Sequence, residues 1–173
     1  MYLMDDIKNW RAVYRLLDRV QTEMYDCGTL CGNACCLSGW EDSENGIFLL
    51  PGEHLLLKEA DPEGKWYTWE TYTKEEVEFP DSWTGPVYFV KCTTPPNCLR
   101  SLRPLQCRTF PLKPVIGENG VLEMIWSDDE LPYTCPLIEG NYPIRDDYYK
   151  ATYTVWSHLL RDRRIFELVS VWS

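Results

Sequence analysis

The sequence lacks the features that would place a protein in a membrane or on the secretory route. Its apolar runs are far shorter than the roughly 20 residues that span a bilayer. Residues 1–4 lead straight into Asp5 and Asp6, without the basic start, apolar stretch and small-residue cleavage site of a signal peptide. We therefore expect a cytoplasmic protein that does not use a membrane as a partner.

Positive charge is also scarce. The 173 residues include 17 Lys and Arg against 27 Asp and Glu, which gives a formal net charge of −10. Nucleic acids and anionic membranes are bound largely through Lys and Arg side chains. This composition therefore argues against a nucleic acid as a partner.

Histidine and the common catalytic motifs are missing or rare as well. His54 and His158 are the only histidines, and neither a Gly-rich phosphate loop nor a His-Glu-x-x-His helix is present. So few histidines argue against a hydrolase of the Ser-His-Asp type. Either histidine could instead complete a metal site made of three cysteines and one histidine.

Cysteine, by contrast, is abundant. Stable disulfides are uncommon in a reducing cytoplasm, so eight cysteines there indicate metal binding or thiol chemistry. They form two groups separated by 55 residues, the first being Cys27, Cys31, Cys35 and Cys36, and the second Cys92, Cys98, Cys107 and Cys135.

The pattern of the rest of the chain predicts a single α+β domain over residues 1–173, a length close to the usual size of one domain. Apolar residues at intervals of three and four predict helices at residues 5–26 and within 144–169. A short helix is expected at 54–59, and short antiparallel strands at 46–50, 65–73, 86–90, 114–116 and 121–126, with a hairpin turn at 117–120. Long loops between them would be clamped by metal, with a metal-binding core at about 27–136.

The cysteine spacing favours a metal centre without identifying the metal. The pattern is C-x3-C-x3-C-C, then C-x5-C-x8-C-x27-C, and short spacing lowers the entropy cost of bringing thiolates to one point. Zinc ribbons and ferredoxin-type clusters both favour C-x2-C pairs, which are absent here. Zinc and an iron–sulfur cluster therefore both stay open.

The first cysteine group carries two further signals. Gly28, Gly32 and Asn33 favour tight turns and left-handed backbone, which predicts a loop over residues 27–36 rather than a regular helix. Side chains of adjacent residues diverge, so Cys35 and Cys36 are poorly placed to bind one ion. Either the thiols divide between two centres, or some of them are bridging, free or oxidised.

Two arginines flank Cys107 in the stretch Arg103-Pro104-Leu105-Gln106-Cys107-Arg108. A zinc site or an iron–sulfur cluster with four thiolates carries a charge of about −2 by simple counting, and nearby guanidinium groups would offset this charge and donate to sulfur. Arg103 and Arg108 are therefore candidate cofactor-binding residues. The alternative is that they form ion pairs with surface carboxylates.

Taken together, the second group and these arginines read Cys92-x5-Cys98-x4-Arg103-Pro104-x2-Cys107-Arg108-x-Phe110-Pro111, after a segment that ends Cys31-Gly-Asn-Ala-Cys35-Cys36. This arrangement resembles the CxxCxxCC family, whose members are described as zinc- or iron-chelating proteins. The resemblance covers roughly residues 27–135 and implies metal binding. The sequence departs from the family pattern between Cys27 and Cys35, where three residues separate successive cysteines instead of two.

We therefore expect a protein that binds zinc or an iron–sulfur cluster through its cysteine thiolates. One alternative is a redox or transferase enzyme that uses this metal centre or an activated cysteine. Another is a protein stapled by disulfides. The eight Trp and eleven Tyr residues could also line a groove for a protein or peptide partner, although core packing accounts for most of them.

Overall fold

The computed structural model describes residues 2–20, 32–37, 46–95, 99–140 and 143–173, and it shows helices packed with two small antiparallel sheets. The predicted α+β class is confirmed. Cys27, Cys31 and Cys98 lie outside the described residues. The helical elements are η1 (Leu3–Asp5), α1 (Ile7–Asp18), α3 (Ala34–Leu37), α4 (Glu53–Ala60), η2 (Arg100–Leu102), α5 (Leu105–Thr109), α6 (Asp146–Leu159) and α7 (Arg163–Trp172), and the strands are β1 (Ile47–Phe48), β2 (Tyr67–Tyr72), β3 (Val87–Cys92), β4 (Leu112–Ile116) and β5 (Leu122–Trp126).

Helix α1 is shorter than its hydrophobic pattern predicts. It begins after Asp6, whose side chain accepts a hydrogen bond from the Lys8 backbone N–H, and it ends at Asp18. Residues 21–26 of the predicted range lie outside the described residues. The predicted helical region at 144–169 is divided into α6 and α7, because Asp162 caps the first turn of α7 through the Arg164 N–H.

The two sheets follow the predicted strands closely. In the larger sheet β3 lies between β1 and β2, and Tyr67 of β2 is paired with Cys92 at the end of β3. Strands β4 and β5 form the predicted hairpin, with Gly120 at φ +75° in its turn. The short helix predicted at 54–59 is α4.

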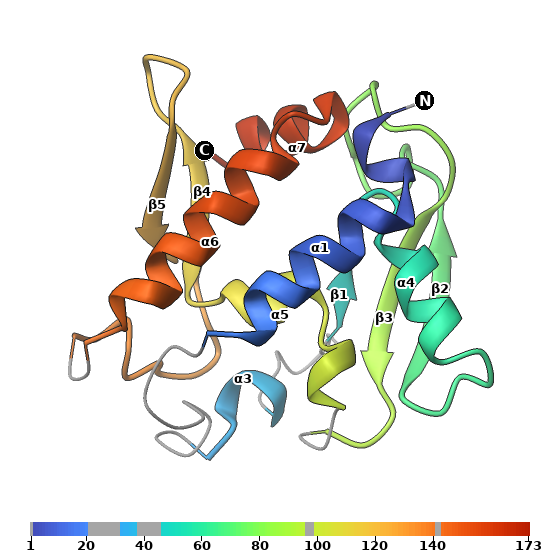
Figure 1. Ribbon diagram of the computed structural model, residues 1–173, viewed down its shortest axis with the longest axis horizontal. Coiled ribbons are helices and arrows are strands. Elements are labelled where there is room, and N and C mark those ends of the chain that lie inside the picture. Colours follow the sequence, from blue (N-terminus) through green and yellow to red (C-terminus); the bar gives the residue numbers. More distant parts are fainter. Residues whose placement is uncertain (1, 21–31, 38–45, 96–98, 141–142) are drawn as a thin grey trace.

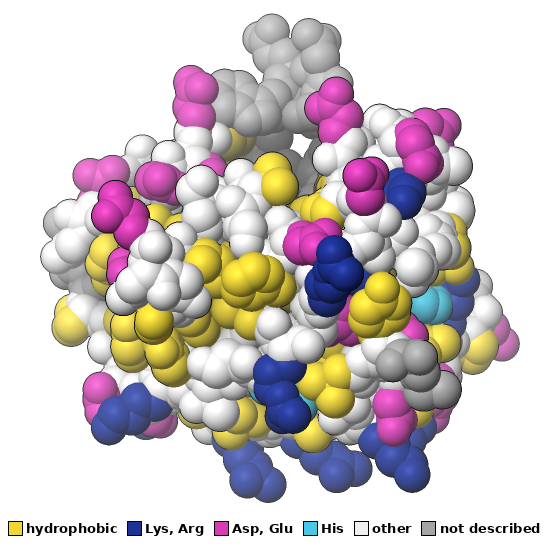
Figure 2. Space-filling model, turned by 90° about the horizontal axis from the view of Figure 1, so that it is seen from above, with side chains coloured by type: hydrophobic (Ala, Val, Ile, Leu, Met, Phe, Trp, Pro, Cys, Tyr) yellow, Lys and Arg dark blue, Asp and Glu magenta, His cyan; other side chains and the backbone are white. Residues whose placement is uncertain are grey.

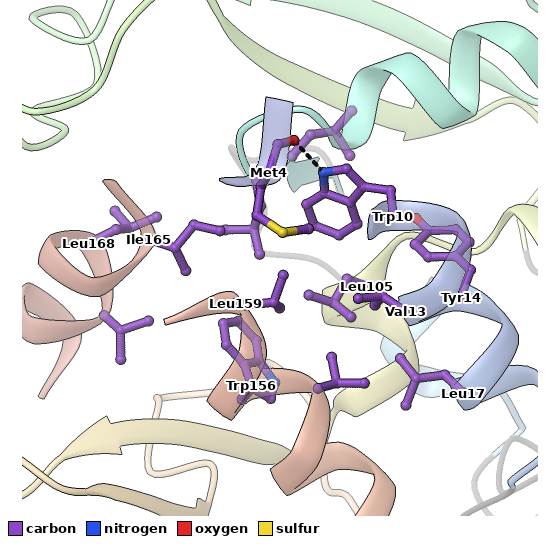
Figure 3. Close-up of a cluster of buried hydrophobic side chains, with 14 of the residues drawn as sticks. Met4, Trp10, Val13, Tyr14, Leu17, Leu105, Trp156, Leu159, Ile165 and Leu168 are labelled. Carbon is purple, nitrogen blue, oxygen red and sulfur yellow. Dashed lines mark hydrogen bonds between the residues drawn. The ribbon is translucent and has the colours of Figure 1, made fainter. Parts of the chain in front are cut away.

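Helices α1, α6 and α7 and the short α5 bury a common core. Figure 3 shows Leu105 of α5 beside Val13 of α1 and Leu159 of α6, with the Trp10 and Trp156 rings on either side. The Trp10 indole N–H also donates to the carbonyls of Met4 and Pro51, 3.1 Å from each, which joins the N-terminal segment to the start of α4. The amphipathic pattern of α1 is therefore a core-packing pattern.

Charge is unevenly distributed over the face of the molecule drawn in Figure 2. Figure 2 shows hydrophobic side chains across the middle of one face, with acidic side chains mostly toward one edge and basic side chains mostly toward the opposite edge. Helix α7, which lies along the top of Figure 1, contributes the exposed Phe166 and Val171. Among the described residues, no helix has the length and apolar character needed to cross a membrane.

Candidate metal centre

Five of the eight cysteines lie in the described part of the chain. Cys35 and Cys36 are in α3, Cys92 ends β3, Cys107 is in the middle of α5, and Cys135 is in the loop after β5. Cys35 and Cys107 are exposed and the other three are half-buried. Within the described residues, no three Cys, His, Asp or Glu side chains are grouped so that they could hold a metal ion.

Two of the elements that carry these cysteines lie toward one end of the molecule. Figure 1 places α3 and the carboxyl end of β3 along the lower part of the view, whereas α5 lies nearer the middle. Gly32 and Asn33, just before α3, have φ of +63° and +59°, so their predicted left-handed backbone is confirmed. The prediction that residues 27–36 form a loop is wrong for 34–36, which belong to the four-residue helix α3.

Helix α5 is the most firmly anchored of these elements. The Leu105 side chain is fully buried in the core, and its backbone N–H donates to the Glu53 carboxylate over 2.7 Å. The Gln106 side-chain amide donates to the carbonyl of Phe48 in β1, also over 2.7 Å. The next residue, Cys107, is exposed. The fold therefore fixes the backbone beneath this thiol while leaving its side chain at the surface.

Glu53 is the centre of the anchoring network. Its carboxylate is fully buried and accepts hydrogen bonds from the Tyr14 hydroxyl at 2.7 Å and from the backbone N–H groups of Leu105 at 2.7 Å and Leu50 at 3.1 Å. Burial raises the pKa of Glu53, because it disfavours the charged form more than these donors favour it. Burial also raises the pKa of Tyr14, and the adjacent carboxylate adds to that shift.

Arg108 ties the same segment to α1. Its guanidinium lies 4.3 Å from the centre of the Tyr14 ring and forms an ion pair with Asp18. It also donates to three backbone carbonyls of the preceding turn, those of Arg103 (2.6 Å), Ser101 (2.8 Å) and Arg100 (3.1 Å). The sequence left open that Arg108 forms an ion pair with a surface carboxylate, and the pair with Asp18 is of this kind. The three bonds to backbone carbonyls hold the turn η2 against α5.

The far end of the segment is held by α6 and by the loop after β5. The Tyr148 hydroxyl donates to the carbonyls of Arg108 at 2.9 Å and Phe110 at 3.3 Å. The Phe110 ring contacts the Tyr133 ring at a centroid distance of 6.4 Å, which joins the α5 segment to the loop that carries Cys135. At its near end, the Tyr67 hydroxyl donates to the Leu102 carbonyl over 2.8 Å.

Sequence patterns did not single out the residues that build this frame. Glu53 follows Pro51 and Gly52, so it reads as an ordinary acidic residue in the first turn of a helix. Tyr14 belongs to the apolar stripe of α1 and reads as core. Only the Arg-Pro-x-x-Cys-Arg stretch was recognised, and the roles of Arg103 and Arg108 toward a metal stay predictions.

Replacing Arg108 by lysine is expected to lower the free energy of unfolding by about 1–3 kcal/mol, because an ammonium group cannot donate to Asp18 and three carbonyls at once. Amide hydrogen exchange in residues 99–103 should accelerate, since that turn loses its fixed donors. Urea unfolding and exchange mass spectrometry would measure both effects. Arg163→Lys is the matched control, because within the described part of the chain that side chain forms an exposed ion pair with Glu167 and no other. Equal losses in the two variants would contradict the proposed role of Arg108.

A scan against protein-family models, a search of curated proteins and a search of solved structures found no match to this chain. The likeness to the CxxCxxCC family therefore depends on the cysteine spacing and on residues 103–108. What the protein does must be inferred from its own side chains.

Proposed function

We propose that this protein binds zinc or an iron–sulfur cluster in the cytoplasm through cysteine thiolates. The thiols would come from Cys27, Cys31, Cys35, Cys36, Cys92, Cys98, Cys107 and Cys135, of which the described five do not make a complete site by themselves. The observation that carries the proposal is the exposed Cys107 thiol on a backbone held by a buried carboxylate, a buried tyrosine hydroxyl and a nearly buried guanidinium.

The exposure of Cys107 is informative because cysteine is among the most frequently buried residue types. Leu105 and Thr109, two positions before and after Cys107, are both buried. Helix α5 therefore packs one side against the core and exposes the side that carries Cys107. Ligands bind metal well when their backbone is held in place by a supporting set of hydrogen bonds. The bonds to Glu53 and Arg108 supply such support beneath the thiol.

The donor set also fits the proposed metals. Thiolates are soft ligands that select zinc and iron–sulfur clusters over magnesium or calcium. Bound zinc would stabilise the loops, whereas a bound cluster could also transfer electrons. Arg108 already donates to protein oxygens, so we expect it to act on the centre mainly through its charge, and we propose Arg103 as the second basic neighbour.

The test is metal analysis of protein purified without oxygen. We expect about one or two equivalents of zinc without colour, or iron and sulfide with absorption near 400 nm. Cys107→Ser and Cys98→Ser should each lose bound metal, whereas Ser157→Ala, at an exposed small side chain in the last turn of α6, should keep it. Unchanged metal content in both cysteine variants would overturn the proposal.

An enzyme that uses the metal centre or Cys107 for redox or transfer chemistry is the second candidate, and the exposure of the Cys107 thiol favours it. The two candidates differ in whether the thiol is available when metal is bound. Alkylation of Cys107 by iodoacetamide in fully metal-loaded protein would favour the enzyme. Protection of Cys107 until a chelator is added would favour closed coordination by protein thiolates.

A further inference from the structure

A cavity of about 220 Å³ lies between the N-terminal segment, the start of α4, the loop at 83–86 and the start of α7. Its polar lining groups are Asp5, His54, Thr84 and Arg164, and the Trp83 and Tyr88 rings form part of its walls. None of the five described cysteines lines it. Pockets for drug-sized ligands are usually about 300–1,000 Å³, so this cavity suits a smaller molecule.

Arg164 lines this cavity, and the carboxylates of Asp162 and Asp5 neutralise its charge. Its side chain is only 3% exposed. Both carboxylate oxygens of the buried Asp162 accept from it, at 3.0 and 2.8 Å, and Asp5 accepts at 2.8 Å. The Tyr2 ring lies 4.2 Å from the guanidinium carbon. A guanidinium with two carboxylate partners offers little net attraction to an anionic ligand.

Asp5 carries the excess negative charge at this site. Its side chain is 37% exposed, and apart from Arg164 it accepts only the Tyr2 backbone N–H among the described residues. Two carboxylates thus lie against one guanidinium. Burial lowers the pKa of His54 and the charge of Lys58 lowers it further, against a smaller opposing effect of Asp5, so the charged form of the imidazole is disfavoured. Lys58 itself lies over the Tyr88 and Trp69 rings and does not line the cavity.

The remaining lining suits a short apolar group. Leu49, Leu50, Pro51 and Pro86 join the Trp83 and Tyr88 rings around the polar groups. Aromatic faces attract organic cations as well as alkyl groups. The cavity therefore combines two carboxylates against one guanidinium, aromatic walls and room for a small organic molecule, since a cavity of about 150 Å³ already holds benzene.

We propose that this cavity binds a small organic ammonium ion, a primary amine with a short alkyl tail, with Asp5 as its counter-ion. The ammonium group donates to the Asp5 carboxylate and the tail packs against Trp83 and Pro86. This proposal does not depend on the metal centre, because none of the five described cysteines lines the cavity; Leu50, whose N–H donates to Glu53, is the lining residue shared with the α5 network.

The experiment is a titration of the full chain with isobutylammonium chloride in phosphate buffer at low ionic strength, followed by NMR. The His54 ring and Trp83 indole signals should shift with a saturable dependence, while His158, outside the cavity lining, should not. Isobutyrate and isobutanol, which share the alkyl skeleton, should produce no saturable shift. Equal responses to the amine and the acid, or no response to the amine, would overturn the proposal.

Asp5→Asn should weaken amine binding at least tenfold. Asp6→Asn is the matched control, because it removes the same charge one residue away while asparagine can still cap α1. A folded Asp5→Asn protein that binds the amine as tightly as the wild type would also overturn the proposal. If Asp5→Asn does not fold, the comparison of His54 with His158 in the wild type decides the question.

Discussion

Replacing Glu53 by alanine is expected to lower the free energy of unfolding by about 3 kcal/mol or more. The substitution leaves the Tyr14 hydroxyl and the N–H groups of Leu50 and Leu105 without their acceptor in the interior. Each buried donor left unsatisfied costs about 1–3 kcal/mol. Urea unfolding followed by tryptophan fluorescence would measure the loss, which is large for a domain whose total stability is typically about 5–15 kcal/mol.

Glu59→Ala is the matched control for this substitution. Glu59 lies in the same helix, but its carboxylate is exposed and forms a surface ion pair with Arg11 at 2.6 Å. Surface ion pairs contribute at most about 1 kcal/mol, so this variant should remain close to the wild type. Similar losses in the two variants would show that the Glu53 network has no special role.

The Glu53 carboxyl should also make stability depend on pH in a defined direction. Its pKa in the folded protein is raised above its ordinary value of 4.5, so the folded state binds the proton more tightly than the unfolded state. The stabilising contribution is therefore fully present below pH 4.5 and is lost as the pH rises through the raised pKa. Relative to Glu53→Gln, which does not titrate there, the wild type should lose stability as the pH rises above 4.5. If the free energy of unfolding of the wild type instead rose relative to that of Glu53→Gln as the pH increased, the raised pKa of Glu53 would be contradicted.

Gly52→Ala is expected to be at least as damaging, with a loss above about 3 kcal/mol. Gly52 has φ +83°, and left-handed backbone costs an L-residue about 1–2 kcal/mol. In addition, a Cβ at this position would lie 1.8 Å from the Met4 carbonyl oxygen, which must therefore move. That carbonyl accepts the Trp10 indole N–H, and the Met4 N–H donates to Asp162, so the displacement would break contacts around the core. Thermal and urea unfolding would measure the effect.

Gly120→Ala separates the backbone cost from the steric cost. Gly120 has a similar φ of +75° in the β4–β5 turn, but nothing lies within 4 Å of a Cβ added there. This variant should lose only about 1–2 kcal/mol, the cost of the left-handed conformation. If Gly52→Ala were no worse than Gly120→Ala, the close approach of Met4 to the start of α4 would not matter for stability.

Sequence patterns predicted those elements whose causes lie within a few residues. The stripe of apolar residues in α1 and the turn at 117–120 are local signals, and both correspond to observed elements. The end of α1 at Asp18 was not predicted, because the apolar spacing continues to Met24 and the pattern contains no clear stop signal. The short α3 was also missed, since Gly32 and Asn33 favour a turn and four residues are too few to show helical periodicity.

The sequence by itself determined the α+β class, the single hairpin turn and the concentration of cysteines around Arg103 and Arg108, because composition, periodicity and spacing are properties of the chain alone. Only the tertiary structure decided that Glu53 is buried and accepts the N–H of Leu105, 52 residues further along the chain. It also decided that Asp162 neutralises Arg164 beside the cavity. Local patterns cannot reveal such pairs, since a carboxylate has the same sequence signature whether the fold leaves it in water or surrounds it with buried donors.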